Sequence, residues 1–328
     1  MLSFAGLIFG IVLLIAGGGL LVRGASEIAA KFGVSPMIVG LTIVGFGTSA
    51  PELVVNVVSA LRGETALAFG NVVGSNIANV GLILGIAAVL APISIQGQIV
   101  RREVPFLLLV TTILTVMVLD KPLEGLPGLI GRTESVVLLL LFCIFLYMSA
   151  VDVFQDRRSD PLMLDIEDNP LMKPPVDAGR WQWLLVVVGL MLLFIGGEMT
   201  VRNGVALANA LGVSANVIGL VLVAIGTSMP ELVTSIIAAL RKESDLALGN
   251  VVGSNLFNSL IVLPVSGLIR PIPLPPGGVT DLIVSWGLVA LLIPVFYIGE
   301  ARLDRKVGGF LLLAYAAYMA SRFLFDQP

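Results

Sequence analysis

The sequence predicts an all-α polytopic membrane protein with ten transmembrane helices in two inverted five-helix repeats. Composition is the first observation: 57% of the 328 residues are hydrophobic and only 12% are charged, whereas a soluble domain carries about 25% charged residues. An internal repeat is the second observation. The third is that five spans, an odd number, precede the second copy. The two halves therefore cross the membrane in opposite directions, as in secondary transporters.

The repeat consists of two polar segments within apolar surroundings. GTSAPE at 47–52 recurs as GTSMPE at 226–231, and GNVVGSNIAN at 70–79 recurs as GNVVGSNLFN at 249–258. Both segments recur at the same offset, and 26 of the 50 positions of the ungapped windows 34–83 and 213–262 are identical. Apolar helices that resemble each other by chance do not keep Gly, Thr, Ser, Pro, Glu and Asn in register, so this is an internal duplication.

The expected spans follow from runs of about 20 apolar residues, the length that crosses a hydrocarbon core about 30 Å thick. They are 2–22, 35–61, 66–92, 104–120, 134–152, 183–208, 214–240, 245–269, 279–298 and 308–325. The first run has no positive residue before it, which favours a membrane helix over a cleaved signal peptide. The second and seventh spans contain the GTS-x-PE segments, and the third and eighth contain the GN-x-x-GSN-x-x-N segments.

Loop charges predict the orientation of these spans. With the N-terminus outside, 13 of the 19 Lys and Arg fall on the cytoplasmic side and 6 on the outer side. The positive-inside rule therefore favours both termini outside. The polar, proline-containing segment 153–182 is expected to be a cytoplasmic linker between a first repeat at 1–152 and a second at 183–328. Its acids lack the spacing of a calcium-binding loop.

The GTS-x-PE segments place a carboxylate inside an apolar helix. Pro51 and Pro230 each remove a backbone donor, and neighbouring glycines relax the helix, so we expect two half-helices that meet just before Glu52 and Glu231. Such breaks are tolerated where the backbone lines a cavity. A carboxylate at the bilayer centre costs at least about 2.5–3.5 kcal/mol, and no Lys or Arg lies in the core of these segments.

A bound cation or a proton must therefore compensate the two glutamates. The carbonyls of Thr48 and Thr227 and the hydroxyls of Ser49 and Ser228 complete a hard-oxygen site. That chemistry suits calcium and also sodium. With no histidine and a single cysteine in the chain, it does not suit zinc or copper. A single intramembrane Glu could be a protonated packing residue, but two in matched motifs favour an ion site.

The second repeated segment supplies amides and hydroxyls. Ser75 and Asn79 are four residues apart and share one helix face, as do Ser254 and Asn258. The glycines of this segment form small-xxx-small patterns that favour close helix packing. For four other amides, interhelical hydrogen bonding is at least as well supported as ion ligation. These are Asn71, Asn76, Asn250 and Asn255.

The paired GTS-x-PE and GN-x-x-GSN-x-x-N segments resemble the alpha repeats of the cation/calcium exchanger superfamily, most closely its prokaryotic sodium/calcium exchangers. The resemblance implies that helices 2, 3, 7 and 8 are broken around a central ion site, and that helices 1 and 6 slide past this core. It assigns calcium to the glutamates and the threonine carbonyls, and sodium to the glutamates and the serines. The implied ligand positions are Glu52, Glu231, Thr48, Thr227, Ser49, Ser228, Ser75, Ser254, Asn79 and Asn258.

We therefore expect an antiporter that exchanges sodium for calcium by alternating access. Proton-coupled calcium antiport is the alternative, although that branch carries GN-x-x-E. Potassium-dependent relatives carry Asp where this chain has Asn258. An intramembrane enzyme and a channel are the competing classes. The inverted repeat favours a transporter over a channel, and the repeated motifs contain no Asp of the kind that membrane aspartyl proteases use.

The expected setting follows from the same observations. The protein is expected in a prokaryotic inner (plasma) membrane, with calcium and sodium as transported ions and the lipid bilayer as its partner. No cofactor, no enzymatic activity, no nucleic acid and no obligate protein partner are expected. The net charge of −3 is too small to indicate anything about nucleic acid, and the chain has no basic run that could follow a phosphate backbone.

Overall fold

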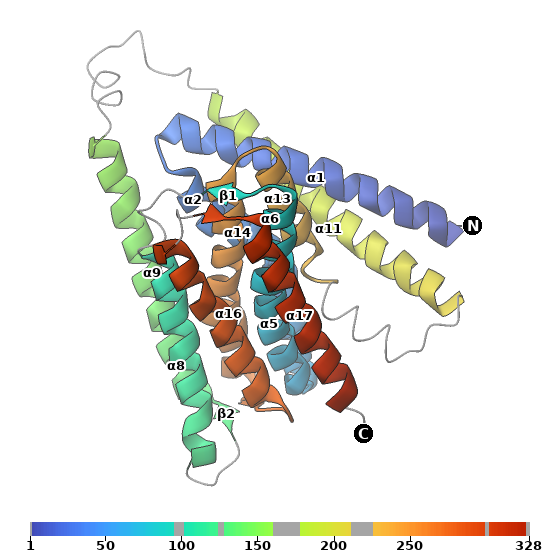
Figure 1. Cartoon of the computed structure of the whole chain (residues 1–328), viewed down its shortest axis with the longest axis vertical. Helices are drawn as coiled ribbons and strands as arrows, with labels where there is room; N and C mark the ends of the chain where they lie inside the picture. Colours follow the sequence, from blue (N-terminus) through green and yellow to red (C-terminus); the bar gives the residue numbers. More distant parts are fainter. Residues whose placement is uncertain are drawn as a thin grey trace.

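A computed structural model describes residues 2–94, 102–123, 128–159, 178–210, 226–298 and 302–325 (Figure 1). The first half contains α1 (Leu2–Phe32), α2 (Pro36–Val39), η1 (Gly40–Val44), α3 (Gly45–Thr48), α4 (Ala50–Arg62), α5 (Thr65–Ala78), η2 (Asn79–Ile83), α6 (Leu84–Leu90), β1 (Ile93–Ser94), α8 (Glu103–Leu123), β2 (Leu129–Ile130) and α9 (Arg132–Ser159). The second half contains α11 (Ala178–Ala210), α13 (Met229–Leu240), α14 (Ser244–Phe257), η3 (Asn258–Val262), α15 (Leu263–Ile269), β3 (Ile272–Pro273), α16 (Gly278–Ile298), β4 (Arg302–Leu303) and α17 (Arg305–Phe325). The segments named η are π-helical.

Helices occupy the described part of all ten predicted spans. Six of them are long and apolar enough to cross a membrane, and the bent pair Pro36–Thr48 and Ala50–Arg62 makes a seventh. The other three predicted spans correspond to α8, α13 and α17. Two ends of the expected linker 153–182 are helical, because α9 continues to Ser159 and α11 begins at Ala178. Residues 160–177, the rest of that linker, lie outside the described residues.

The predicted end of the first helix was wrong, because α1 continues to Phe32 instead of ending near residue 22. Its polar end is held by an ion pair one turn apart, Arg23 Nε to Glu27 Oε1 at 2.7 Å, and by a hydrogen bond from Gln182 Nε2 to Glu27 Oε2 at 3.3 Å. A 31-residue helix is about 46 Å long, which exceeds the hydrocarbon thickness of about 30 Å.

The two long helices α1 and α11 form an antiparallel pair that runs obliquely to the other helices (Figure 1). Glycines make the close contact. A Cβ added at Gly17 would lie 2.8 Å from the carbonyl oxygen of Gly189, and one added at Gly10 would lie 3.0 Å from that of Gly196. Small residues are what permits helices to approach this closely in a membrane. The pair therefore moves as one packed unit if it moves at all.

The duplication is visible in the element boundaries. α5, η2 and α6 begin at Thr65, Asn79 and Leu84, and α14, η3 and α15 begin at the three positions that correspond to these in the second copy. Two short antiparallel ribbons repeat the same relation. β1 pairs with β4, and β3, the counterpart of β1, pairs with β2. Each ribbon therefore joins one half of the chain to the other.

The helix interruptions take two forms. The second span bends by 43° between Thr48 and Ala50, where Pro51 has no backbone N–H to continue the hydrogen-bond ladder. The third and eighth predicted spans are continuous helices over Thr65–Leu90 and Ser244–Ile269. Their expected breaks are replaced by the π-helical segments η2 and η3. A π turn accommodates one extra residue without ending the helix. The first half of the seventh span, up to residue 225, lies outside the described residues.

Candidate cation-binding site

The two glutamates begin equivalent half-helices. Glu52 lies in the first turn of α4 and Glu231 in the first turn of α13. Each follows a serine with nearly the same backbone, φ −86° and ψ 7° at Ser49 and φ −87° and ψ 9° at Ser228. Carboxylates are favoured in a first turn, because the free backbone N–H groups and the helix dipole point toward them. The local fold therefore fixes where both carboxylates lie.

Burial of these carboxylates is complete in both halves. Glu52 is 0% and Glu231 1% exposed, and Ser49, three residues before Glu52, donates a hydrogen bond to Glu231 Oε1 at 2.9 Å. Two buried acids in one region repel each other in the absence of a compensating positive charge. No group of three or more His, Cys, Asp or Glu that could hold a metal occurs in the described part of the chain. Most of the ligands at this site must therefore be neutral oxygens.

Five buried side-chain oxygens around the site accept no hydrogen bond. They are Glu52 Oε1, Glu52 Oε2, Glu231 Oε2, Asn79 Oδ1 and Asn258 Oδ1. Buried polar atoms in folded proteins are nearly always paired, and an exception requires a reason such as an ion. All five atoms are acceptors, from two glutamates and two symmetry-related asparagines. The arrangement therefore lacks a positively charged group and has the donor set of a hard cation.

The neighbouring hydroxyls direct their protons away from Glu52. Thr227 donates to Asn71 Oδ1 at 3.2 Å, and Ser228 donates to Ser75 Oγ at 3.2 Å. A hydroxyl has one proton and two acceptor lone pairs. Thr227 lines the same cavity as Pro51, the residue before Glu52, and both hydroxyl protons are used elsewhere. The hydroxyl oxygens thus remain available as ligands beside the carboxylate.

Ser49 breaks the symmetry of the site. It donates a hydrogen bond to Glu231 Oε1 at 2.9 Å, whereas its counterpart Ser228 donates to Ser75. One oxygen of Glu231 is consequently satisfied, and both oxygens of Glu52 are left without a donor. Of the two carboxylates, Glu52 has the greater capacity to bind a cation in this conformation.

Amide pairs hold the four central helices together in a symmetrical way. Thr48 Oγ1 donates to Asn250 Oδ1 at 3.1 Å, the counterpart of the Thr227–Asn71 bond. Asn79 Nδ2 donates to Asn255 Oδ1 at 2.9 Å, and Asn258 Nδ2 donates to Asn76 Oδ1 at 3.2 Å. Asn71, Asn76, Asn250 and Asn255 therefore make interhelical hydrogen bonds, which is one of the two roles that the sequence left open for them. These bonds use the amide protons of Asn79 and Asn258, which turns their carbonyl oxygens into the free acceptors.

All ten sequence-predicted positions lie in this one region of the four central helices. Nine of the ten are buried, with exposed fractions of 0–3%, and Thr227 is partly exposed. Sequence reasoning missed Asn56 and Ser235, which are also buried. Asn71 Nδ2 donates to Asn56 Oδ1 at 2.7 Å, and Asn250 Nδ2 donates to Ser235 Oγ at 2.8 Å.

Asn56 and Ser235 could have been found from their position. Each lies four residues after its glutamate and hence on the same helix face, and the two occupy equivalent positions in the two copies of the repeat. Both orient an asparagine that holds a threonine of the site. They did not attract notice because the two residue types differ between the copies.

A cavity of about 610 Å³ connects to one side of the site. It lies between α4 and α11, and its lining includes Pro51, Asn71, Thr227, Pro230 and Glu198. This cavity explains why Thr227 is the partly exposed member of the site. The described conformation therefore gives the site access from the end of the molecule where Arg62 lies.

We predict that Ser49→Ala weakens calcium binding by about tenfold. The change removes the hydroxyl oxygen at position 49, and loss of one ligand contact worth about 1.4 kcal/mol lowers the affinity about tenfold. Calcium titration of the purified protein would check this value. Ser94→Ala, at an exposed position in β1, is the control. Unchanged affinity in Ser49→Ala would show that this hydroxyl is not part of the site.

Inverted halves, crossing helices and a buried cluster of unpaired oxygens define an integral membrane ion transporter. The chain belongs to the sodium/calcium exchanger protein family, whose model matches residues 2–151 and 181–324. Membership makes it a cation/calcium exchanger, from a family of transporters and not of enzymes. The expected resemblance to prokaryotic sodium/calcium exchangers is thereby confirmed.

Individual relatives extend over nearly the whole chain. It is 38% identical over 315 residues to the putative antiporter CaxA of Alkalimonas amylolytica, covering 94% of this chain and 95% of that protein. It is 30% identical to the sodium/calcium exchanger MaX1 of Methanosarcina acetivorans, with 98% of each covered. The solved structure of the sodium-calcium exchanger NCX_Mj, soaked with 10 mM Na⁺ and zero Ca²⁺, superposes with a TM-score of 0.82, 29% identity and 98% of each chain covered. That protein is a ten-helix inverted-repeat membrane protein, which confirms the fold class.

Proposed function

We propose that this protein exchanges sodium for calcium across the membrane by alternating access, with the ten predicted positions as ion ligands. The unpaired oxygens of Glu52, Glu231, Asn79 and Asn258 carry the proposal. Calcium takes 6–8 oxygens in flexible geometry, and the five free side-chain oxygens with nearby hydroxyls and carbonyls supply that number. Relatives named as sodium/calcium exchangers support the choice of ions.

Charge explains why the two ions would exchange and not travel together. Two carboxylates balance one calcium ion or two sodium ions, so the site cannot hold a full load of both. Calcium and sodium compete for the same oxygens, so binding of one ion displaces the other. Each ion then stabilises the conformations that bind it best. Neutral serine hydroxyls add ligands without adding charge, which suits a monovalent ion. A proton carrier requires only the carboxylates.

The deciding experiment loads reconstituted vesicles with calcium at fixed pH, with sodium, potassium or choline outside. Sodium should accelerate calcium efflux several-fold over potassium and choline, because sodium ions occupy the same oxygens. A second arm imposes a proton gradient in choline. Fast efflux in that arm, with no further effect of sodium, would replace this proposal with proton/calcium antiport. Glu52→Gln vesicles measure the leak that is independent of the protein.

We also propose that the termini lie outside the cell, that residues 153–182 lie in the cytoplasm, and that the cavity opens outward. The cation count of 13 against 6 supports this orientation. Val54 lines the cavity and is 62% exposed. An impermeant thiol reagent added to intact cells should therefore react with a cysteine placed at Val54 in a chain whose exposed Cys143 has been changed to serine. Labelling only in inside-out vesicles would reverse the orientation.

A further inference from the structure

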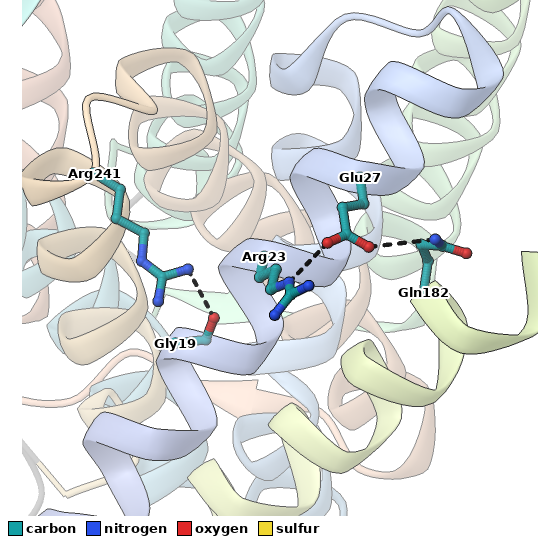
Figure 2. Close-up of polar contacts among 5 residues, drawn as sticks. All are labelled: Gly19, Arg23, Glu27, Gln182 and Arg241. Atoms are coloured by element: carbon teal, nitrogen blue, oxygen red, sulfur yellow. Dashed lines mark hydrogen bonds and ion pairs between the residues drawn. The ribbon is translucent and has the colours of Figure 1, made fainter. Parts of the chain in front are cut away.

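The end of the molecule opposite the cavity is closed by contact between α1 and α13. A Cβ added at Gly18 would lie 2.8 Å from Ile237 Cδ1 and 3.1 Å from Val233 Cγ1. At the C-terminal end of α13, the capping residue Arg241 donates a hydrogen bond from Nη1 to the carbonyl oxygen of Gly19 at 3.0 Å (Figure 2). These contacts pack the long helix against the half-helix that begins with Glu231.

The corresponding surfaces at the cavity end do not touch. The counterparts in the other copy of the repeat are Gly197, Val58, Val54, Arg62 and Glu198. Val54 is 62% and Val58 38% exposed. Among the described residues the only atom near a Cβ added at Gly197 is Met229 Cβ, at 3.9 Å. The cavity fills the space where α11 would pack on α4.

One pair of counterparts differs in chemistry. Arg241 and Arg62 are the same residue type, whereas Gly19 is replaced by Glu198. At the closed end the hydrogen bond that Arg241 makes within the described residues goes to a backbone carbonyl, that of Gly19. A Cβ added at Gly19 would lie 3.2 Å from Arg241 Nη2. If α11 packed on α4 in the same way, the Cβ of Glu198 would lie beside the guanidinium of Arg62. The carboxylate of Glu198 could then reach that guanidinium.

We propose that Glu198 and Arg62 form an ion pair that closes the cavity in the opposite state of the transport cycle. Inverted repeats exchange their conformations when access alternates, so α11 then packs on α4 as α1 now packs on α13. In the described state both side chains are exposed, and neither makes an ion pair with any described residue. The closing contact at the Arg62 end thus pairs opposite charges, whereas Arg241, the counterpart of Arg62 at the other end, donates to the backbone carbonyl of Gly19.

The consequence is an unequal balance between the two states. An ion pair present in only one state stabilises that state alone. Exposed ion pairs are worth about 0.2–1 kcal/mol, which corresponds to a shift of the equilibrium of up to about fivefold. Glu198 thus acts as a positioning residue that favours closure of the cavity at the Arg62 end. The inference rests on the proposed alternating access but not on the identity of the coupled ion.

Cysteine accessibility measures this balance directly. In a Cys143→Ser background, Val54→Cys reports the open cavity and Val233→Cys reports opening at the other end. Impermeant thiol reagents are applied to proteoliposomes from the side that each cysteine faces. Glu198→Gln should raise the ratio of the Val54 rate to the Val233 rate about two- to fivefold. Arg62→Gln should raise it equally, because either change removes the same pair.

Two further variants separate the ion pair from a general disturbance. The exchange Arg62→Glu with Glu198→Arg should return the ratio to within about twofold of the parent, since opposite charges still meet. Arg202→Gln, one turn further along the same face of α11, should leave it unchanged. An unchanged ratio in both single variants, or no rescue by the exchange, would overturn the ion pair. Failure of the cysteine at Val233 to react in any variant under any ion condition would instead contradict alternating access itself.

Discussion

Glu52→Gln and Glu231→Gln are each expected to reduce calcium transport at least about a hundredfold while leaving a folded protein. Each change removes one of the two formal charges at the site and keeps the side-chain volume. Two unit charges about 4 Å apart interact by about 4 kcal/mol at an effective dielectric constant near 20, and a divalent ion doubles the interaction. A difference of about 1.4 kcal/mol corresponds to a factor of ten in affinity. Initial rates of calcium uptake into sodium-loaded vesicles measure the loss.

The matched control is Glu64→Gln, which removes an exposed carboxylate from the loop after α4. It should retain parental rates, because it lies outside the buried oxygen cluster. The amide nitrogen in Glu52→Gln carries two N–H donors and cannot ligate a cation. Calcium binding should therefore fall along with transport. Parental transport in either well-folded glutamine variant would falsify the proposed site.

Gly253→Ala is expected to have the next largest effect, through packing and not through charge. A Cβ at this position would overlap the carbonyl oxygen of Leu41 and would lie 2.7 Å from its Cα. Backbone atoms cannot move aside as a flexible side chain can. The helix α14, which contains Gly253, must therefore separate from η1, which contains Leu41. Overpacking of this kind costs about 1–3 kcal/mol, and we expect the upper end.

Thermal unfolding in detergent and calcium transport should both decline in Gly253→Ala. The separation would also lengthen the hydrogen bond from Thr48 to Asn250 and the contact of Thr48 with Ser254. Gly309→Ala is the control, since nothing lies within 4 Å of a Cβ added there, and alanine favours a helix over glycine by about 1 kcal/mol. Equal melting temperatures in the two variants would show that the described helix contact is wrong.

The positions of the site could be read from the sequence because they repeat. Glu52 and Glu231, with the serines and threonines before them, stood out as polar groups in matched apolar runs. The spacing within a helix then placed Ser75 with Asn79 and Ser254 with Asn258 on shared faces. The structure adds that the asparagine amide protons are used between helices, which leaves their carbonyl oxygens free. No sequence pattern states which atom of an amide is satisfied.

Other features left no readable signal in the sequence. The π-helical segments η2 and η3 change the helical turn without changing composition, so the sequence did not predict them, and the family resemblance implied breaks in their place. The strands β1–β4 are two residues long each, too short for any alternation to show. The extra length of α1 was missed because its last turns are polar. The length of an apolar run indicates how much of a helix lies in the hydrocarbon core, and the helix can continue beyond it. Asn56 and Ser235 were missed because the copies use different residues for one task.

The two ribbons have a consequence for ancestry. β1 of the first half pairs with β4 of the second, and β3 pairs with β2, so each half supplies strands that only the other can complete. Each half likewise supplies one of the two buried carboxylates, Glu52 and Glu231. A single ancestral half could therefore have been complete only as a dimer of two identical chains inserted in opposite orientations. Fusion then made the opposite orientations permanent within one chain, and freed residues such as Glu198 to diverge from their counterparts.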